Sequence, residues 1–134
     1  YVKNQIKQAD QKMNEYKVAE SLDALFEIFD KANKYIDETT PWTLAKKEDE
    51  RDRLATVMYN LLESIRIGAV ILQAFLPDTA ERIFKQLNTT NKTYESIYEF
   101  NGLSAGTKLK KPEILFERID KQKKLEEIKD FNKK

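Results

Sequence analysis

The chain has 134 residues, of which 40% are hydrophobic and 35% are charged, and its formal net charge is +1. This length suits one domain with a single hydrophobic core. The chain contains neither cysteine nor histidine, which excludes disulfides, thiolate nucleophiles, imidazole bases and the usual zinc ligands. The small net charge does not by itself predict nucleic-acid binding. Because the sequence opens at Tyr1 rather than at Met, we expect it to be a piece of a longer protein.

No signal peptide is visible at the start of the chain. The longest apolar stretch, residues 65–76, is interrupted by Arg66 and Gln73 and is shorter than the ~18 residues that a membrane-spanning helix needs. We therefore expect a soluble, cytoplasmic protein without a membrane partner.

The first part of the chain shows helical periodicity. Residues 2–15 carry a thin apolar stripe that predicts a helix, formed by Val2, Ile6, Ala9 and Met13. Residues 17–39 carry a stronger stripe that predicts a second helix packed on the core, formed by Val18, Leu22, Leu25, Phe29, Ala32 and Ile36. Pro41 ends this pattern because proline disfavours a helical conformation in the preceding Thr40, so residues 39–47 are predicted to form a loop.

The second part of the chain begins with a predicted central helix, from about Asp49 to Phe75, whose later half is apolar on two faces. Pro77 is placed to start a short fourth helix. After Asn88 the sequence becomes irregular, with one helical turn expected around residues 94–98 and glycine-rich turns before Pro112. Apolar residues then predict a strap that returns to the bundle surface, formed by Ile114, Leu115, Phe116 and Ile119.

The expected fold class is therefore all-α, a bundle of four to five helices with an irregular C-terminal strap. Residues 1–120 form this bundle. Residues 121–134 are highly charged, with Leu125, Ile128 and Phe131 as their apolar residues, and this segment is interpreted as a solvated last helix, a frayed tail or a linker.

The feature most suggestive of function is the single tryptophan, Trp42, which lies beside Pro41 between two predicted helices. Large aromatic side chains are usually buried, which favours a structural interpretation in which Trp42 closes one end of the bundle. The alternative is an exposed ring that stacks on an unpaired base of an RNA loop.

Polar residues near Trp42 have the same two interpretations. Asn33 and Asp37 lie one helical turn apart near the end of the second helix, and their side chains suit base edges. They can equally cap or brace the helix end, because such side chains readily bond to backbone. Lys46 and Lys47 can contact phosphate, although exposed lysines are more often only solvated.

Three segments of the chain carry a resemblance to one family, and they occur in the same order as in that family. Residues 32–46 read ANKYIDETTPWTLAK and resemble a segment of bacterial methionyl-tRNA synthetases that carries a tryptophan used in anticodon recognition. Residues 62–72 read LESIRIGAVIL and look like that family's next helix. Residues 102–109 and 111–120 read GLSAGTKL and KPEILFERID, and they look like its terminal strap.

This resemblance implies the helical anticodon-binding domain of an ATP-dependent methionine–tRNA ligase. The catalytic domain, with its ATP and methionine sites and any zinc, would lie upstream of Tyr1, so this chain alone is expected not to be an enzyme and to hold no cofactor. The implied partners are that upstream domain and the anticodon loop of tRNA(Met). Trp42 would stack on a base of the CAU anticodon, Pro41 would fix the approach of its loop, and Asn33 and Asp37 would be supports or secondary contacts.

The sequence departs from the family pattern in one respect. An Asn and an Arg that read the anticodon in the family lie on a preceding helix that has no counterpart here, so half of the site is expected to be absent. Two other hypotheses stay open. One is a structural or protein-interaction bundle whose partner covers the Val2, Ile6, Ala9 and Met13 stripe, and the other is a stand-alone enzyme that uses carboxylates or lysine.

Overall fold

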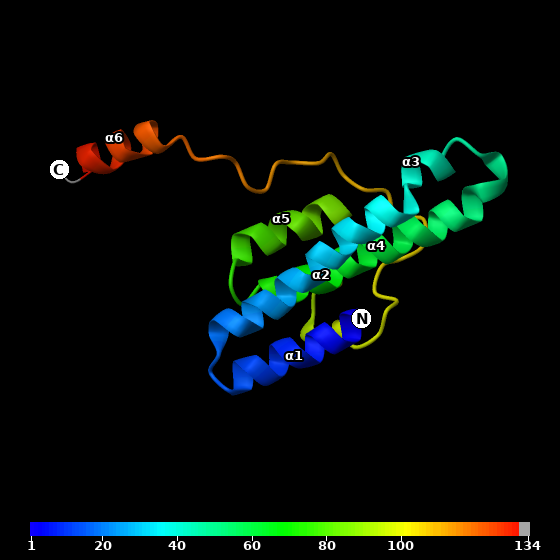
Figure 1. The fold of residues 1–134 in the computed structure, drawn as a ribbon, viewed down its shortest axis with the longest axis horizontal. Helices are drawn as coiled ribbons and strands as arrows, with labels where there is room; N and C mark the ends of the chain where they lie inside the picture. The colour runs from blue at the N-terminus through cyan, green and yellow to red at the C-terminus, as the bar shows by residue number, and fades with distance from the viewer. Residues whose placement is uncertain (132–134) are drawn as a thin grey trace.

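The computed structural model describes residues 1–131, and these form helices and connecting loops without a β-strand. The expected all-α class is confirmed (Figure 1). Four helices build the bundle: α1 (Val2–Asn14), α2 (Val18–Thr39), α4 (Arg51–Leu72) and α5 (Pro77–Leu87). The remaining helical elements are α3 (Pro41–Leu44), the 3-10 turns η1 (Glu48–Glu50) and η2 (Tyr94–Ile97), and α6 (Lys121–Phe131).

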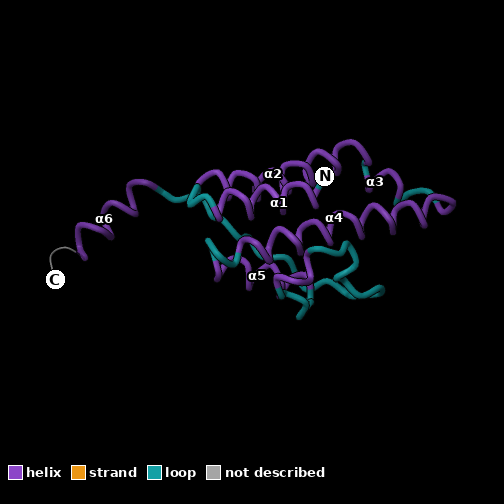
Figure 2. The backbone as a smooth tube through the Cα atoms, turned by 90° about the horizontal axis from the view of Figure 1, so that it is seen from below, coloured by secondary structure: helices purple, strands orange, loops and turns teal. Residues whose placement is uncertain are grey.

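The bundle has three layers, with α4 lying between the α1–α2 pair and α5 (Figure 2). In α1 the predicted stripe is largely covered, because Ile6 and Ala9 are 1% and 2% exposed, while Met13 is 37% exposed. The stripe therefore packs inside the bundle and is not an open surface for a protein partner. This removes one of the two observations behind the interaction-bundle hypothesis, while the low net charge stays.

The buried face of α2 matches the predicted one at five of its six positions, since these are buried or packed against a hydrophobic cluster: Leu22, Leu25, Phe29, Ala32 and Ile36. Val18 is 52% exposed, so its assignment to the core face was wrong. The buried residues of α2 are Ser21, Ala24, Leu25, Ile28 and Ala32. Small residues at positions 21 and 24 let α1 approach closely, and the Ser21 hydroxyl donates a hydrogen bond to the Ala9 carbonyl at 2.9 Å. A polar Ser21 in the core is missed by a pattern that counts apolar residues only.

The central helix α4 was predicted over residues 49–75 and spans Arg51–Leu72, with η1 before it and turns after it. Its later half is surrounded as predicted, since Ile67, Val70 and Ile71 are all buried. The stretch Glu48–Leu72 is long and apolar enough to cross a membrane, but half of its apolar window is buried inside the bundle. Core helices of soluble proteins pass the same test.

Two separate hydrophobic clusters lie along the bundle. The main core joins α1, the first part of α2, the later half of α4 and α5, and it includes Ile6, Leu25, Ile28, Ile67 and Phe84. The second, here called the Leu44 cluster, joins α2, α3 and α4 and consists of Ala32, Leu44, Val57 and Leu61, with Tyr35, Ile36 and Leu54 packed against it.

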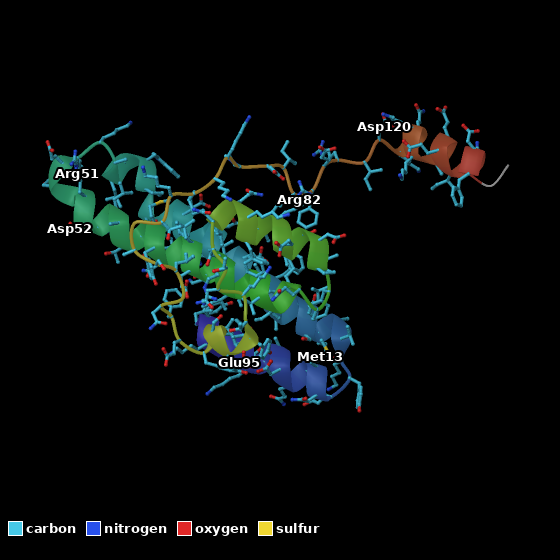
Figure 3. All side chains as sticks on the ribbon, turned by 180° about the vertical axis from the view of Figure 1, so that it is seen from behind. Met13, Arg51, Asp52, Arg82, Glu95 and Asp120 are labelled. Atoms are coloured by element: carbon cyan, nitrogen blue, oxygen red, sulfur yellow. The ribbon has the colours of Figure 1, made fainter. Side chains whose placement is uncertain are left out.

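The strap, residues 104–120, returns across α5 as predicted, and hydrogen bonds as well as apolar contacts hold it there. Arg82 of α5 lies beside the strap (Figure 3) and donates to the carbonyls of Ile114 at 2.6 Å and Leu115 at 3.2 Å. Leu115 is partly buried against the main core, whereas Ile114, Phe116 and Ile119 are mostly exposed. Backbone carbonyls bonded by Arg82, together with the side chain of Leu115, therefore attach this segment.

The charged C-terminal segment forms α6 over Lys121–Phe131, which lies away from the bundle and is exposed along its length (Figures 1 and 2). Of the predicted possibilities, the solvated helix applies to these residues. The last part of the predicted segment, residues 132–134, lies outside the described residues.

Candidate nucleic-acid interface

Trp42 lies on a short helix rather than in a loop. The segment predicted as a loop contains one helical turn, α3, with Pro41 at its start, where a missing N–H costs nothing. Thr40 ends α2 and precedes α3 in a left-handed conformation, with φ 42°. Its N–H donates to the Ile36 carbonyl at 2.9 Å. The effect of Pro41 on Thr40 was predicted, but the helical turn after it was not.

The side chain of Trp42 is 54% exposed. The structural interpretation, in which Trp42 closes the end of the bundle, is therefore wrong. Leu44, which is 6% exposed, fills that place instead. The sequence did not identify Leu44 as a buried residue, because a spacing of two from Trp42 places the two side chains on opposite sides only if residues 41–44 are helical.

Asn33 and Asp37 are both exposed on α2, the helix that leads into the Trp42 turn. Among residues 1–131, neither side chain makes a hydrogen bond, and α2 ends with a backbone cap from the Thr40 N–H to the Ile36 carbonyl. The Thr39 hydroxyl instead donates to the Tyr35 carbonyl at 2.6 Å. The bracing role considered for Asn33 and Asp37 is therefore not realised, and their polar atoms stay available to a ligand.

Asn33 also borders an apolar groove of about 710 Å³ between α2, α5 and the strap. The groove is lined on the α2 side by Phe26, Phe29 and Ile36, and on the strap side by Leu109 and Pro112. The face of α2 that carries Asn33 is therefore concave, although no residue of α3 lines the groove.

The cations around the Trp42 turn differ in their partners. Lys34 pairs with Glu38 at 3.8 Å, Arg51 with Glu48 at 3.2 Å and Arg53 with Glu50 at 3.9 Å. Lys46 and Lys47, which follow α3, are exposed and make no ion pair within the part of the chain that the structure describes. These two lysines are therefore the cations nearest Trp42 in sequence whose charge is not already balanced by a carboxylate.

The groups exposed around Trp42 are ones that can bind a ligand. Within residues 1–131, no three Asp, Glu, His or Cys side chains come together to hold a metal ion. The exposed indole of Trp42 is suited to stacking on a base. The free side chains of Asn33 and Asp37 are suited to hydrogen bonds with base edges, and those of Lys46 and Lys47 to contacts with phosphate. Fold and site together describe an all-α module whose exposed groups have the chemistry to bind an unpaired nucleic-acid segment.

A family sequence model described as the anticodon binding domain of methionyl tRNA ligase matches residues 1–134, and the chain belongs to this family. A methionine–tRNA ligase of Clostridium tetani is 53% identical over 116 residues, which cover 87% of this chain and 18% of that protein. The enzyme of Clostridium acetobutylicum is 50% identical over 119 residues, covering 89% and 18%. That of Bacillus subtilis is 40% identical over 127 residues, covering 92% and 19%. The chain thus spans less than a fifth of the length of these relatives.

Proposed function

We propose that this chain is the part of a methionine–tRNA ligase that reads the CAU anticodon of tRNA(Met), with Trp42 as a stacking platform. The observation that carries the proposal is the half-exposed indole on α3, in a chain that belongs to the anticodon-binding family. An unpaired anticodon base presents a π-face to such a ring, and stacking of this kind contributes about 1–3 kcal/mol per base.

The neighbouring residues supply direction and charge. Pro41 fixes the backbone at the start of α3, and thereby the approach of Trp42 to the base. Asn33 can donate and accept at a base edge, while Asp37 can only accept and so suits an exocyclic amino group such as that of cytosine. Lys46 and Lys47 contact phosphate and contribute affinity without sequence preference.

The rest of the proposed ligase lies outside this chain. Its catalytic domain would bind ATP, methionine and any zinc, and it would carry out aminoacylation in the cytoplasm. This chain supplies recognition and does not aminoacylate by itself. A helix preceding Tyr1, with the Asn and Arg readers of the family, would complete the anticodon site.

The proposal is tested by replacing the ring. Trp42→Ala is expected to weaken binding of an RNA stem-loop carrying CAU by about 5- to 150-fold, the range that corresponds to 1–3 kcal/mol. Trp42→Phe keeps an aromatic face and should retain part of the affinity. Phe131→Ala removes an exposed aromatic ring on α6 and serves as the control. Wild-type affinity in a folded Trp42→Ala variant would contradict the proposal.

A further inference from the structure

The Trp42 turn is attached to the bundle through the Leu44 cluster. Leu44 is the buried residue of α3, and it packs with Ala32 of α2 and with Val57 and Leu61 of α4. Around this contact, the Asn60 side-chain amide of α4 donates a hydrogen bond to the Tyr35 hydroxyl of α2 at 3.5 Å. The cluster is separate from the main core, so it serves the end of the bundle where α3 lies.

Little else in α3 can hold the turn in place. Four residues form one helical turn, and a turn of this length is not stable in water without tertiary contacts. Its backbone hydrogen bonds are local, from the Thr43 N–H to the Thr40 carbonyl at 2.8 Å and from the Ala45 N–H to the Pro41 carbonyl at 2.9 Å. Burial of Leu44 is therefore the contact that connects α3 to the bundle.

The same contact sets the direction of the indole. Successive residues of an α-helix are rotated by about 100°, so Trp42 and Leu44 point to nearly opposite sides of the turn. We infer that Leu44 is a positioning residue whose burial turns the Trp42 ring outward and holds it there. A platform held in this way loses less freedom on binding. The RNA-binding part of this inference rests on the proposed anticodon function, whereas the orientation of the ring does not.

The test compares two truncations at leucines of similar burial. Leu44→Ala empties the Leu44 cluster, and Leu87→Ala truncates a leucine of the main core, with exposures of 6% and 5% in the wild type. Circular dichroism checks the fold of each 134-residue variant. Fluorescence anisotropy then reports on Trp42, which is the single tryptophan of the chain, and a CAU stem-loop titration gives the affinity.

We expect Leu44→Ala to lower the Trp42 anisotropy and to weaken RNA binding by about tenfold, which corresponds to 1.4 kcal/mol. Leu87→Ala should change neither quantity in the folded protein. Leu44→Met keeps the side-chain volume, so we expect both the Trp42 anisotropy and the RNA affinity of this variant to be close to those of the wild type.

Three results would overturn the inference. The first is an unchanged anisotropy in folded Leu44→Ala, and the second is an equal loss of affinity in Leu87→Ala. The third is loss of the helical signal in Leu44→Ala, since Leu44 would then support the whole fold rather than Trp42. Failure of the anticodon proposal can be distinguished from failure of this inference. If only the anticodon proposal fails, Trp42→Ala binds CAU as tightly as the wild type, and the anisotropy of Leu44→Ala still reports the position of the Trp42 ring.

Discussion

Arg66 is a large side chain without exposed surface, and it is held by hydrogen bonds on every side of its guanidinium group. It donates to both oxygens of Glu63 at 2.8 and 2.9 Å, and to the carbonyls of Asn91 and Ser96. Glu63 also accepts from the N–H groups of Gly102 and Leu103. The buried pair thereby attaches the irregular segment after α5 to the central helix.

Position 102 holds glycine because the Arg66 guanidinium group leaves no space for a side chain there. A Cβ atom at position 102 would lie 2.2 Å from Nη2 of Arg66. The guanidinium group cannot move aside without breaking the hydrogen bonds that satisfy its buried charge, so position 102 requires a residue without a side chain.

Removing Arg66 should therefore cost much of the stability of the fold. We expect Arg66→Ala to lower the free energy of unfolding by about 3–5 kcal/mol, because it leaves Glu63 buried without its cation. Urea unfolding measures the change. Glu38→Ala, which removes the exposed partner of Lys34, should change stability by less than about 1 kcal/mol. A similarly small effect of Arg66→Ala would show that the buried pair does not stabilise the fold.

This pair marks a limit of sequence reasoning at the residue scale. Arg66 was noticed only as an interruption of an apolar stretch. The distant partners, Ser96 for Arg66 and Gly102 for Glu63, lie far along the chain in a segment without periodicity, so no local pattern connects them to the pair. A Glu and an Arg three residues apart in the most apolar helix were the one signal available.

Thr40 is the element boundary on which the site depends. It has a φ of 42°, in the left-handed region, where a β-branched side chain is strained. The strained residue separates α2 from α3 and so lets the chain turn before Trp42.

Glycine at this position should relieve the strain. We expect Thr40→Gly to raise the free energy of unfolding by up to about 1 kcal/mol and to leave CAU affinity unchanged. Thr43→Gly, a control inside α3, should instead lower stability by about 0.5–1 kcal/mol. Thermal or urea unfolding of the two variants gives the comparison. Destabilisation by Thr40→Gly would mean that the left-handed conformation is not strained in this protein.

At the element scale the sequence was sufficient for the long helices and insufficient for the short one. Periodicity located α1, α2, α4 and α5 to within a few residues, because each buries an apolar face. The face of α2 was misjudged at Val18 since the position of α1 against Ser21 is a tertiary feature. α3 has no period of its own, and its existence depends on the space that α2 and α4 leave for Leu44.

Across the whole molecule, the first helix is linked to the segment after α5 through Asp10. The hydroxyls of Tyr94 and Tyr98 both donate to the Asp10 carboxylate, the latter at 3.3 Å. Desolvation, followed by the hydrogen bond to Asp10 and the charge of its carboxylate, raises the pKa of Tyr94 and of Tyr98 above the usual tyrosine value. The folded state therefore holds these protons more tightly than the unfolded state does.

Because the folded state holds these protons more tightly, the free energy of unfolding falls at alkaline pH. The contribution of Tyr94 is complete below the unfolded tyrosine pKa of about 10 and is lost as pH rises from there towards the raised folded pKa. We expect the free energy of unfolding to fall more steeply between about pH 9.5 and 11 in the wild type than in Tyr94→Phe. Urea unfolding across this range measures both slopes, and equal slopes would contradict the assignment.

If Trp42 is a platform for an anticodon base, stacking of that base will change the fluorescence of the Trp42 indole. Two RNA stem-loops, one with CAU and one with the first anticodon base changed, are titrated into the chain. We expect CAU to quench the emission of Trp42 at lower RNA concentration than the changed stem-loop does. Binding of CAU that leaves the emission unaltered, or equal quenching by both RNAs, would contradict this expectation.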